Sequence, residues 1–166
     1  EGRKPVRDDL HAAIMEGARD DGKLVAFDPN IRPSLWPDVA DMRASLMAAA
    51  AASTIALPTH SDDAPFFGDR SPEETVKRYL DAGAKEVVVK NGPHPVHVST
   101  GRNSMFVSVE DVEHVVDATG AGDAFNGAYL AARLTGANPE SAARTGSRMA
   151  ARVIRHQGAL IPRAHR

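Results

Sequence analysis

The stretch Asp117-Ala-Thr-Gly-Ala-Gly-Asp-Ala-Phe-Asn-Gly127 decides the fold of this 166-residue chain. Its short Gly-rich turn, Thr119 to Gly122, runs directly into an amphipathic segment that begins near Ala121. A helix N-terminus offers unpaired backbone N–H groups and the positive end of the helix dipole, which together favour an anion such as phosphate. The small residues at 120–122 let that anion come close to the backbone. The stretch therefore predicts a phosphate site at the start of a helix.

Asp123 stands in the first turn of that predicted helix. A carboxylate beside a phosphate site is electrostatically unfavourable unless it performs chemistry, and removing the proton of an attacking hydroxyl is such chemistry. The alternative is that Asp123 only complements the helix dipole, an interaction of about 0.3–1 kcal/mol. Asp123 is a catalytic base only if it removes the proton of the hydroxyl.

Strand and helix patterns alternate along the whole chain, as is typical of a layered α/β sheet. Apolar and β-branched runs at 24–28, 54–57 and 86–90 predict buried, mostly parallel strands. Residues 96–98 and 105–109 predict a short antiparallel pair, and residues 158–162 an edge strand. Helical spacing and capping residues predict helices before Gly22, over 38–52, from Ser71 to Gly83, from Ala121 to Gly136, and from Asn138 to Val153. The sequence predicts one domain without a linker.

Composition narrows the classes of function. The chain is 42% hydrophobic and 25% charged, as ordinary globular domains are, and it is long enough for one hydrophobic core. A net charge of −2 gives no reason to expect a nucleic acid or an acidic membrane as partner. The chain has no cysteine, which excludes disulfides, and no apolar run of membrane-spanning length. We therefore expect a cytoplasmic protein that binds small molecules.

Residues 117–123 resemble the second signature of the ribokinase-like, pfkB-type carbohydrate kinases, which reads Asp-Thr-x-Gly-Ala-Gly-Asp, with Ala118 at a tolerant position. The resemblance implies a ribokinase-like layered α/β/α sandwich with a mostly parallel sheet. It also implies ATP-dependent phosphorylation of a sugar or sugar-acid hydroxyl. The cofactors implied are ATP and Mg²⁺, and a monovalent cation such as K⁺ is left open.

The same resemblance implies roles for single residues. Asp123 would be the catalytic base that deprotonates the substrate hydroxyl. The anion hole for the transferring phosphate would consist of Gly120, Ala121 and Gly122, with the backbone N–H groups of Ala121, Gly122 and Asp123 as its donors. Thr119, Gly120, Ala121 and Gly122 would also contact the nucleotide.

Polar residues also follow the predicted strand 24–28, in the loop Asp28-Pro-Asn-Ile-Arg-Pro-Ser-Leu-Trp36. Ligands of open α/β sheets gather at the carboxyl ends of strands, and Arg32 is a planar, permanently charged donor suited to phosphate or carboxylate. By composition alone, a rigid turn with a surface arginine explains the loop equally well. The loop resembles one in 2-keto-3-deoxygluconate kinases and bacterial fructokinases. That resemblance implies Asn30 and Arg32 as nucleotide contacts, Arg32 as a substrate contact, and Trp36 as a packing residue.

Many family members carry Asn-x-x-Glu after the second strand, where it organises Mg²⁺ and phosphate through water. In this chain Thr59 takes the Asn position and Asp62 the Glu position. Because Mg²⁺ prefers oxygen ligands, the resemblance implies Asp62 as a metal residue acting through water, with Asp63 as the alternative. A solvated acidic loop is the other interpretation of this segment.

Two further nucleotide contacts follow from resemblance. Lys90-Asn-Gly92 is similar to the family's Lys-x-Gly segment beside the nucleotide, which implies Lys90 and Gly92 as contacts. Pro95 replaces the second glycine usual there and cannot adopt glycine's conformations. A lysine that merely closes a buried strand is the alternative. Ser147 lies where relatives often carry an Asn near the adenine, and we assign it to the nucleotide site.

The resemblance covers nearly the whole chain, yet the family's N-terminal half is missing and residue 1 is Glu. We expect residues 1–166 to be the C-terminal nucleotide-binding and catalytic part of a carbohydrate kinase, without the N-terminal half that carries the sugar-site lid. A homo-oligomer of the full-length protein is left open. The similar segments favour 2-keto-3-deoxygluconate, phosphorylated at its 6-position, as the substrate; a fructokinase or another sugar kinase of the same family is the alternative. From another class, a catalytically inactive nucleotide-binding fragment is also left open.

Overall fold

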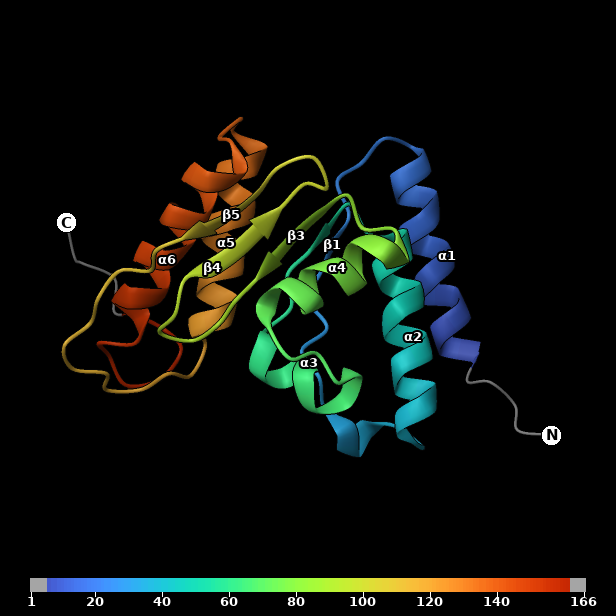
Figure 1. Ribbon diagram of the computed structural model, residues 1–166, viewed down its shortest axis with the longest axis horizontal. Coiled ribbons are helices and arrows are strands. Elements are labelled where there is room, and N and C mark those ends of the chain that lie inside the picture. The colour runs from blue at the N-terminus through green and yellow to red at the C-terminus, as the bar shows by residue number, and fades with distance from the viewer. Residues whose placement is uncertain (1–5, 162–166) are drawn as a thin grey trace. The chain divides into compact units, whose positions relative to one another are not determined.

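The computed structural model describes residues 6–161, with side chains from His11 onward (Figure 1). The sequence also predicts that a side chain among Arg7 to Asp9 caps the first helix, but these side chains lie outside the described residues. So does Pro162, at the end of the predicted edge strand. The chain forms two compact units. The first comprises residues 1–92 and 97–104, and the second residues 93–96 and 105–166.

The first unit alternates helices and short strands. The helices are α1 (Val6–Asp20), α2 (Val39–Ala52), α3 (His60–Phe67) and α4 (Pro72–Ala82), and a 3₁₀ turn, η1, spans Pro33–Leu35. Its strands are β1 (Ala26–Phe27), β2 (Ile55–Ala56), β3 (Glu86–Val89) and all but the first residue of β4 (Val96–Ser99). The second unit holds all but the first residue of β5 (Ser104–Val107), together with α5 (Ala121–Leu134) and α6 (Pro139–Val153).

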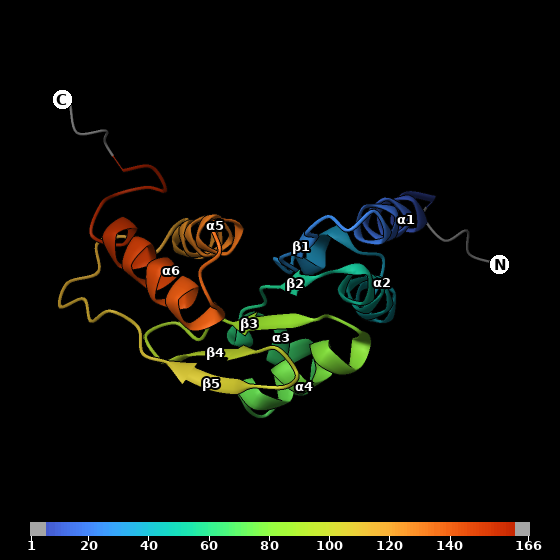
Figure 2. The same ribbon diagram turned by 90° about the horizontal axis from the view of Figure 1, so that it is seen from above.

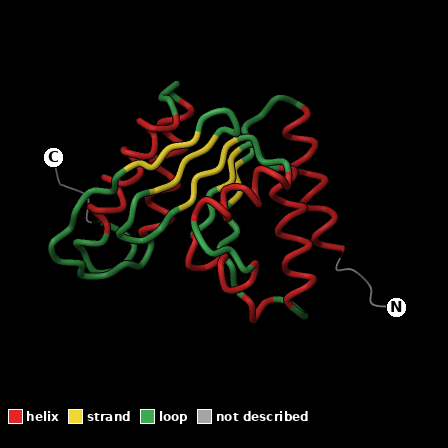
Figure 3. The backbone as a smooth tube through the Cα atoms, viewed as in Figure 1, coloured by secondary structure: helices red, strands yellow, loops and turns green. Residues whose placement is uncertain are grey.

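The sheet has the strand order β1-β2-β3-β4-β5, and Figure 3 shows the strands in yellow. β1 pairs with β2 and β2 with β3 in parallel, whereas β3 pairs with β4 in the antiparallel sense, Val88 opposite Val98. β3 is buried along its whole length, as its β-branched run predicts. The predicted α/β class with a mostly parallel sheet is confirmed, although β1 and β2 are shorter than predicted.

The core of the first unit lies between β3 and the helices α2 and α4. Tyr79 of α4 and Val87 of β3 are fully buried there. α2 contacts both α1 and α4, and Figure 2 shows α1 beside α2. A second small cluster joins Ile31 of the loop after β1 to Met42 and Leu46 of α2. Trp36 packs against this cluster, so its predicted role in packing is confirmed.

Helix α4 begins after Ser71, as the sequence predicts, and a serine followed three residues later by Glu74 is the pattern of a capping box. The Ser71 hydroxyl accepts a hydrogen bond from the Glu74 N–H at 3.4 Å, which is half of a capping box. The Glu74 carboxylate accepts from the Arg70 N–H at 2.7 Å instead of reaching back to Ser71. The Glu74 carboxylate also forms an ion pair with the Arg70 guanidinium. Its bonds to Arg70 therefore replace the second hydrogen bond of a capping box, which would go to the Ser71 N–H.

The acidic segment after β2 forms a helix, α3, and not the loop that was one interpretation of it. Asp62 and Asp63 lie in its first turn, where acidic side chains complement the helix dipole, and Gly68 ends it in a left-handed conformation. Pro65 inside the helix conceals the helical pattern in the sequence.

The second unit is built on α5 packed against α6, which lie side by side in Figure 2. Phe125 and Tyr129 of α5 are buried, and their rings stack with the ring centroids 6.0 Å apart. A Cβ added to Gly146 of α6 would lie 2.9 Å from the Phe125 ring, so only glycine permits this approach. The Asn138 side chain caps α6 by accepting from the Ser141 N–H at 2.8 Å. Residues 158–161 form no strand, contrary to the predicted edge strand.

Candidate active site

The turn before α5 is shaped by Gly120. It is the N-cap of the helix and has a left-handed backbone, with φ +75°. A Cβ added there would lie 2.6 Å from Ala159 Cβ and 3.1 Å from Ala159 Cα. Any larger residue would combine an unfavourable backbone conformation with a steric overlap. Gly120 therefore fixes how closely the turn approaches the tail of the chain.

Asp117 holds this turn with both of its carboxylate oxygens. Oδ1 accepts from the Thr119 N–H at 2.8 Å, and Oδ2 accepts from the Gly158 N–H at 2.8 Å. Hydrogen bonds from Thr119, first from its side chain and then from its backbone, and from the Gly158 backbone hold the pKa of Asp117 below its usual value. Asp117 belongs to the signature, but the sequence predicted no role for it, because its partner at Gly158 is 41 residues away.

The first turn of α5 presents backbone N–H groups. The Ala121 N–H donates to the Ala118 carbonyl at 3.2 Å, and the Ala124 N–H makes the first i→i−4 bond, to Gly120 at 2.9 Å. The N–H groups of Gly122 and Asp123 precede that bond and have no acceptor within the helix. The Asp123 side chain is exposed. Of the three donors predicted for the anion hole, Ala121 is thus already engaged, and Gly122 and Asp123 remain suited to an anion.

Replacing Gly120 by alanine is expected to destabilise the full-length protein by about 2–5 kcal/mol, the sum of left-handed strain and overpacking. The strain arises from φ +75°, and the overpacking from the contact with Ala159. Urea denaturation of the wild-type and variant proteins would measure the difference.

Gly22 offers a matched control for this change. It also has φ +75°, but no atom lies within 4 Å of an added Cβ. Gly22→Ala should therefore cost only the backbone strain of about 1–2 kcal/mol. Ala159→Gly added to Gly120→Ala should restore part of the loss. An equal cost for the two glycine changes would show that the contact with Ala159 is unimportant.

In the first unit, polar groups gather where β1, β2 and β3 end. Lys90, directly after β3, is 8% exposed, and its ammonium group binds the Asp28 carboxylate after β1 at 3.2 Å. The Lys90 N–H donates to the Pro58 carbonyl at 2.9 Å, and the Lys90 carbonyl accepts from the His60 N–H at 2.9 Å. Lys90 thus joins the three loops at the carboxyl edge of the strands, where ligands of α/β sheets bind.

Asn30 and Arg32 lie on the exposed surface of the loop after β1. Asn30 has φ +36°, and its N–H donates to Asp28 Oδ1 at 3.1 Å. The Arg32 guanidinium donates to the Ile31 carbonyl at 3.1 Å, and Ile31 is anchored in the core. Gly92 has φ +58°, so the segment after Lys90 turns through a conformation that favours glycine. The role of Asp28 as the partner of Lys90 was not predicted from the sequence.

The two acids of α3 differ in what they can offer a cation. Asp63 is fully buried and accepts from the Arg78 guanidinium and the Tyr79 hydroxyl, each at 2.8 Å. Asp62 is exposed in the first turn. Within residues 6–161, no group of three or more acidic or histidine side chains could hold a metal ion. These residues therefore fit only a Mg²⁺ ion that shares its coordination with nucleotide phosphates and water, with Asp62 as a contact through water.

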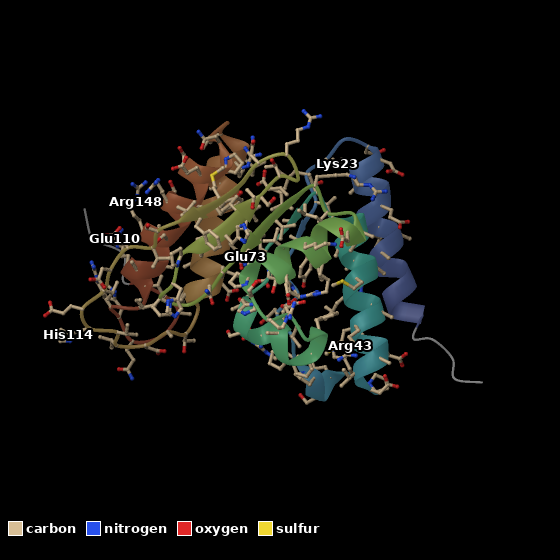
Figure 4. The ribbon with its side chains drawn as sticks, in the orientation of Figure 1. Lys23, Arg43, Glu73, Glu110, His114 and Arg148 are labelled. Carbon is tan, nitrogen blue, oxygen red and sulfur yellow. The ribbon has the colours of Figure 1, made fainter. Side chains whose placement is uncertain are left out.

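Ser147 lies on α6, 5% exposed, and its hydroxyl oxygen accepts from the Glu110 N–H at 2.8 Å. It lines a pocket of about 240 Å³, whose other residues are Ser108, Val109, Glu110, Arg144 and Arg148. Figure 4 labels Glu110 and Arg148 on the segment after β5 and on α6. The sequence predicts Ser147 at a nucleotide site but gives no sign of the charged residues around it, because they belong to two segments distant in sequence.

The sequence match assigns the chain to a protein family. Residues 3–165 match the pfkB family of carbohydrate kinases. The chain belongs to this family, as its signature at 117–123 predicts. Within the described residues, no helix has both the length and the apolar character needed to cross a membrane.

The chain is similar to curated relatives that are named as two different kinases. The 2-dehydro-3-deoxygluconokinase of Escherichia coli K12 is 37% identical over 155 residues, which cover 91% of this chain and 50% of that protein. The ATP-dependent 6-phosphofructokinase of Thermoanaerobacterium thermosaccharolyticum is 32% identical over 160 residues, 96% of this chain and 49% of that protein. The chain thus spans about half the length of these relatives.

Solved structures share the fold. A PfkB protein from Polaromonas sp. JS666 superposes with a TM-score of 0.79 and 30% identity, covering 91% of this chain and 48% of that one. A Vibrio cholerae fructokinase with bound fructose, ADP and calcium superposes with a TM-score of 0.79 and 27% identity, covering 89% of this chain and 49% of that one. A candidate ribokinase II of Escherichia coli, in complex with ATP and Mg²⁺, superposes with a TM-score of 0.75 and 28% identity, covering 87% of this chain and 46% of that one. The ribokinase-like fold is therefore confirmed.

Proposed function

We propose that the full-length protein transfers the γ-phosphoryl group of ATP to a hydroxyl of a sugar or sugar acid. The observation that carries this proposal is the turn at Gly120. It combines a left-handed glycine packed against Ala159, two first-turn N–H groups without a helical acceptor, and an exposed carboxylate at Asp123. Such a turn can stabilise an anion and place a base beside it.

In this proposal Asp123 takes the proton of the attacking hydroxyl, which makes the oxygen a better nucleophile. The N–H groups of Gly122 and Asp123 stabilise charge on the transferring phosphoryl group, because they are fixed before the reaction begins. The nucleotide phosphates are bound by Asn30, Arg32 and Lys90, with the loop at Gly92 beside them, and Arg32 also contacts the substrate. A Mg²⁺ ion bound with the nucleotide would neutralise phosphate charge, and Asp62 would contact it through water.

We propose 2-keto-3-deoxygluconate as the substrate and its 6-phosphate as the product. The support is the name of the Escherichia coli relative, 37% identical over most of this chain. A second candidate is fructose, supported by the similarity to the fructokinase solved with fructose and ADP. The two candidates share the same chemistry at Asp123 and differ only in the acceptor.

Coupled ADP release by the full-length protein tests these assignments, with 2-keto-3-deoxygluconate and fructose assayed side by side. A strong preference for the keto acid is the expected result. A preference for fructose would keep the proposed mechanism and replace the substrate. No turnover with either sugar would leave only nucleotide binding as a candidate activity.

Residues 1–166 expressed alone are expected to show no useful kinase activity. They include the proposed base and anion hole, but we place the segment that closes over the sugar in the other half of the full-length protein, and closure excludes water from phosphoryl transfer. The measurement is coupled ADP release by the fragment and by the full-length protein at equal concentration. Robust turnover by the fragment would refute this prediction.

A further inference from the structure

The pocket beside Ser147 combines opposite charges from two segments. Glu110 belongs to the segment after β5, and Arg148 to α6, and both line the same pocket of about 240 Å³ (Figure 4). Whole small-molecule sites usually measure about 300–1,000 Å³. The pocket is thus suited to one part of a larger ligand, such as the base of a nucleotide.

The two charged groups do not neutralise each other. In the part of the chain that the structure describes, neither the Arg148 guanidinium nor the Glu110 carboxylate forms an ion pair, and Arg148 donates only to the Thr145 hydroxyl, at 3.2 Å. Arg144, also at the pocket, is by contrast paired with Glu140 at 2.8 Å. A planar donor and a carboxylate acceptor therefore both remain available to a ligand in this pocket.

Ser147 adds a third polar group. Its hydroxyl oxygen already accepts from the Glu110 N–H at 2.8 Å, so the hydroxyl hydrogen remains to be donated. The side chain is 5% exposed and lines the pocket. A buried hydroxyl is most stable when its donor is satisfied, and a ligand acceptor in the pocket would satisfy it.

Guanine matches this set of groups on two neighbouring edges. Its O6 and N7 are adjacent acceptors that an arginine can bind with two hydrogen bonds, and its exocyclic N2 amine is a donor to a carboxylate. Adenine offers an acceptor at N7 but a donor at N6, so it uses the arginine less fully. We propose, resting on the kinase function proposed above, that this pocket binds the nucleotide base and accepts guanine as well as adenine. GTP then serves as a phosphoryl donor beside ATP.

The test compares ATP and GTP as donors for the full-length protein, with a saturating sugar acceptor. We expect kcat/KM for GTP to lie within about tenfold of that for ATP. Replacing Arg148 by methionine should lower kcat/KM for GTP by about 5- to 150-fold, the range for losing one two-bond contact to guanine. The same change should alter kcat/KM for ATP by less than about threefold, because adenine lacks the O6 acceptor.

Arg152→Met is the matched control, since Arg152 is exposed on the same helix and does not line the pocket. It should leave both donors unchanged. Calorimetric binding of GDP and ADP gives a second readout that needs no turnover. ATP-only turnover with no GDP binding, or an equal loss for both nucleotides in the Arg148 variant, would overturn the inference. Absence of turnover with any donor, while GDP binds in an Arg148-dependent way, would count against the kinase proposal alone.

Discussion

Replacing Asp123 by asparagine in the full-length protein is expected to lower kcat by about 10²–10⁴-fold, the usual contribution of a general base. Asparagine has nearly the same shape but cannot take the proton of the attacking hydroxyl. The backbone N–H groups of the turn are unchanged by the substitution. Nucleotide binding should therefore persist, and calorimetric titration with ADP should give a dissociation constant close to that of the wild-type protein.

Asp41→Asn provides the control for that experiment. Asp41 lies in the first turn of α2, just as Asp123 lies in the first turn of α5, and both side chains are exposed, so it complements a helix dipole in the same way. It has no part in the proposed chemistry and should leave kcat unchanged. If Asp123→Asn also leaves kcat unchanged, Asp123 is not the base and serves only the helix dipole.

Replacing Arg78 by methionine is expected to lower the free energy of unfolding by about 3–5 kcal/mol, the cost of removing one partner from a buried ion pair. The Arg78 guanidinium binds Asp63 at 2.8 Å and Asp69 at 2.6 Å, and these carboxylates are 0% and 7% exposed. Without Arg78, both carboxylates would be left buried and unpaired. Urea denaturation of the full-length protein measures the loss.

The surroundings of Arg78 explain why methionine cannot compensate. The guanidinium lies 3.7 Å from the centre of the Phe67 ring and 4.7 Å from that of Tyr79, which adds cation–π attraction. Burial would lower the pKa of Arg78, but its hydrogen bonds to Asp69 and Asp63 outweigh burial and raise it, so the group stays charged. Burial raises the pKa of Asp63 despite these partners.

Lys77→Met is the matched control for Arg78→Met. Lys77 precedes Arg78 on α4 and pairs with Asp81 four residues on, with side chains 75% and 63% exposed. An exposed pair of this kind contributes at most about 1 kcal/mol. A loss of less than 1 kcal/mol for Arg78→Met as well would mean that the buried carboxylates become protonated or hydrated at little cost.

Features that depend on neighbouring residues could be predicted from the sequence. The start of α5 follows from the Gly-rich turn, and the cap of α6 from Asn138 before Pro139, because helix termini are set by a few adjacent side chains. The burial of β3 follows from its run of valines. Asp123 could be singled out from the family signature alone, although its catalytic role remains a prediction.

Features that depend on distant partners could not be predicted. Asp28 binds Lys90 across 62 residues, and Asp117 binds Gly158 across 41, and neither spacing has a local signature. Asp63 resembled a solvated acid because its partner Arg78 lies in the next helix. The pocket beside Ser147 was missed for the same reason, since its charged residues come from two separate segments.

The packing of Ala159 against Gly120 bears on how the protein is engineered. Gly158 donates a hydrogen bond to Asp117 in the turn before α5, and Ala159 packs against Gly120 in the same turn. Ending the chain at residue 156 and joining a fusion tag there would remove both residues, although the entire signature at 117–123 would remain. In gene design, the tail therefore belongs with the catalytic motif and is a poor site for trimming or for a protease cleavage sequence.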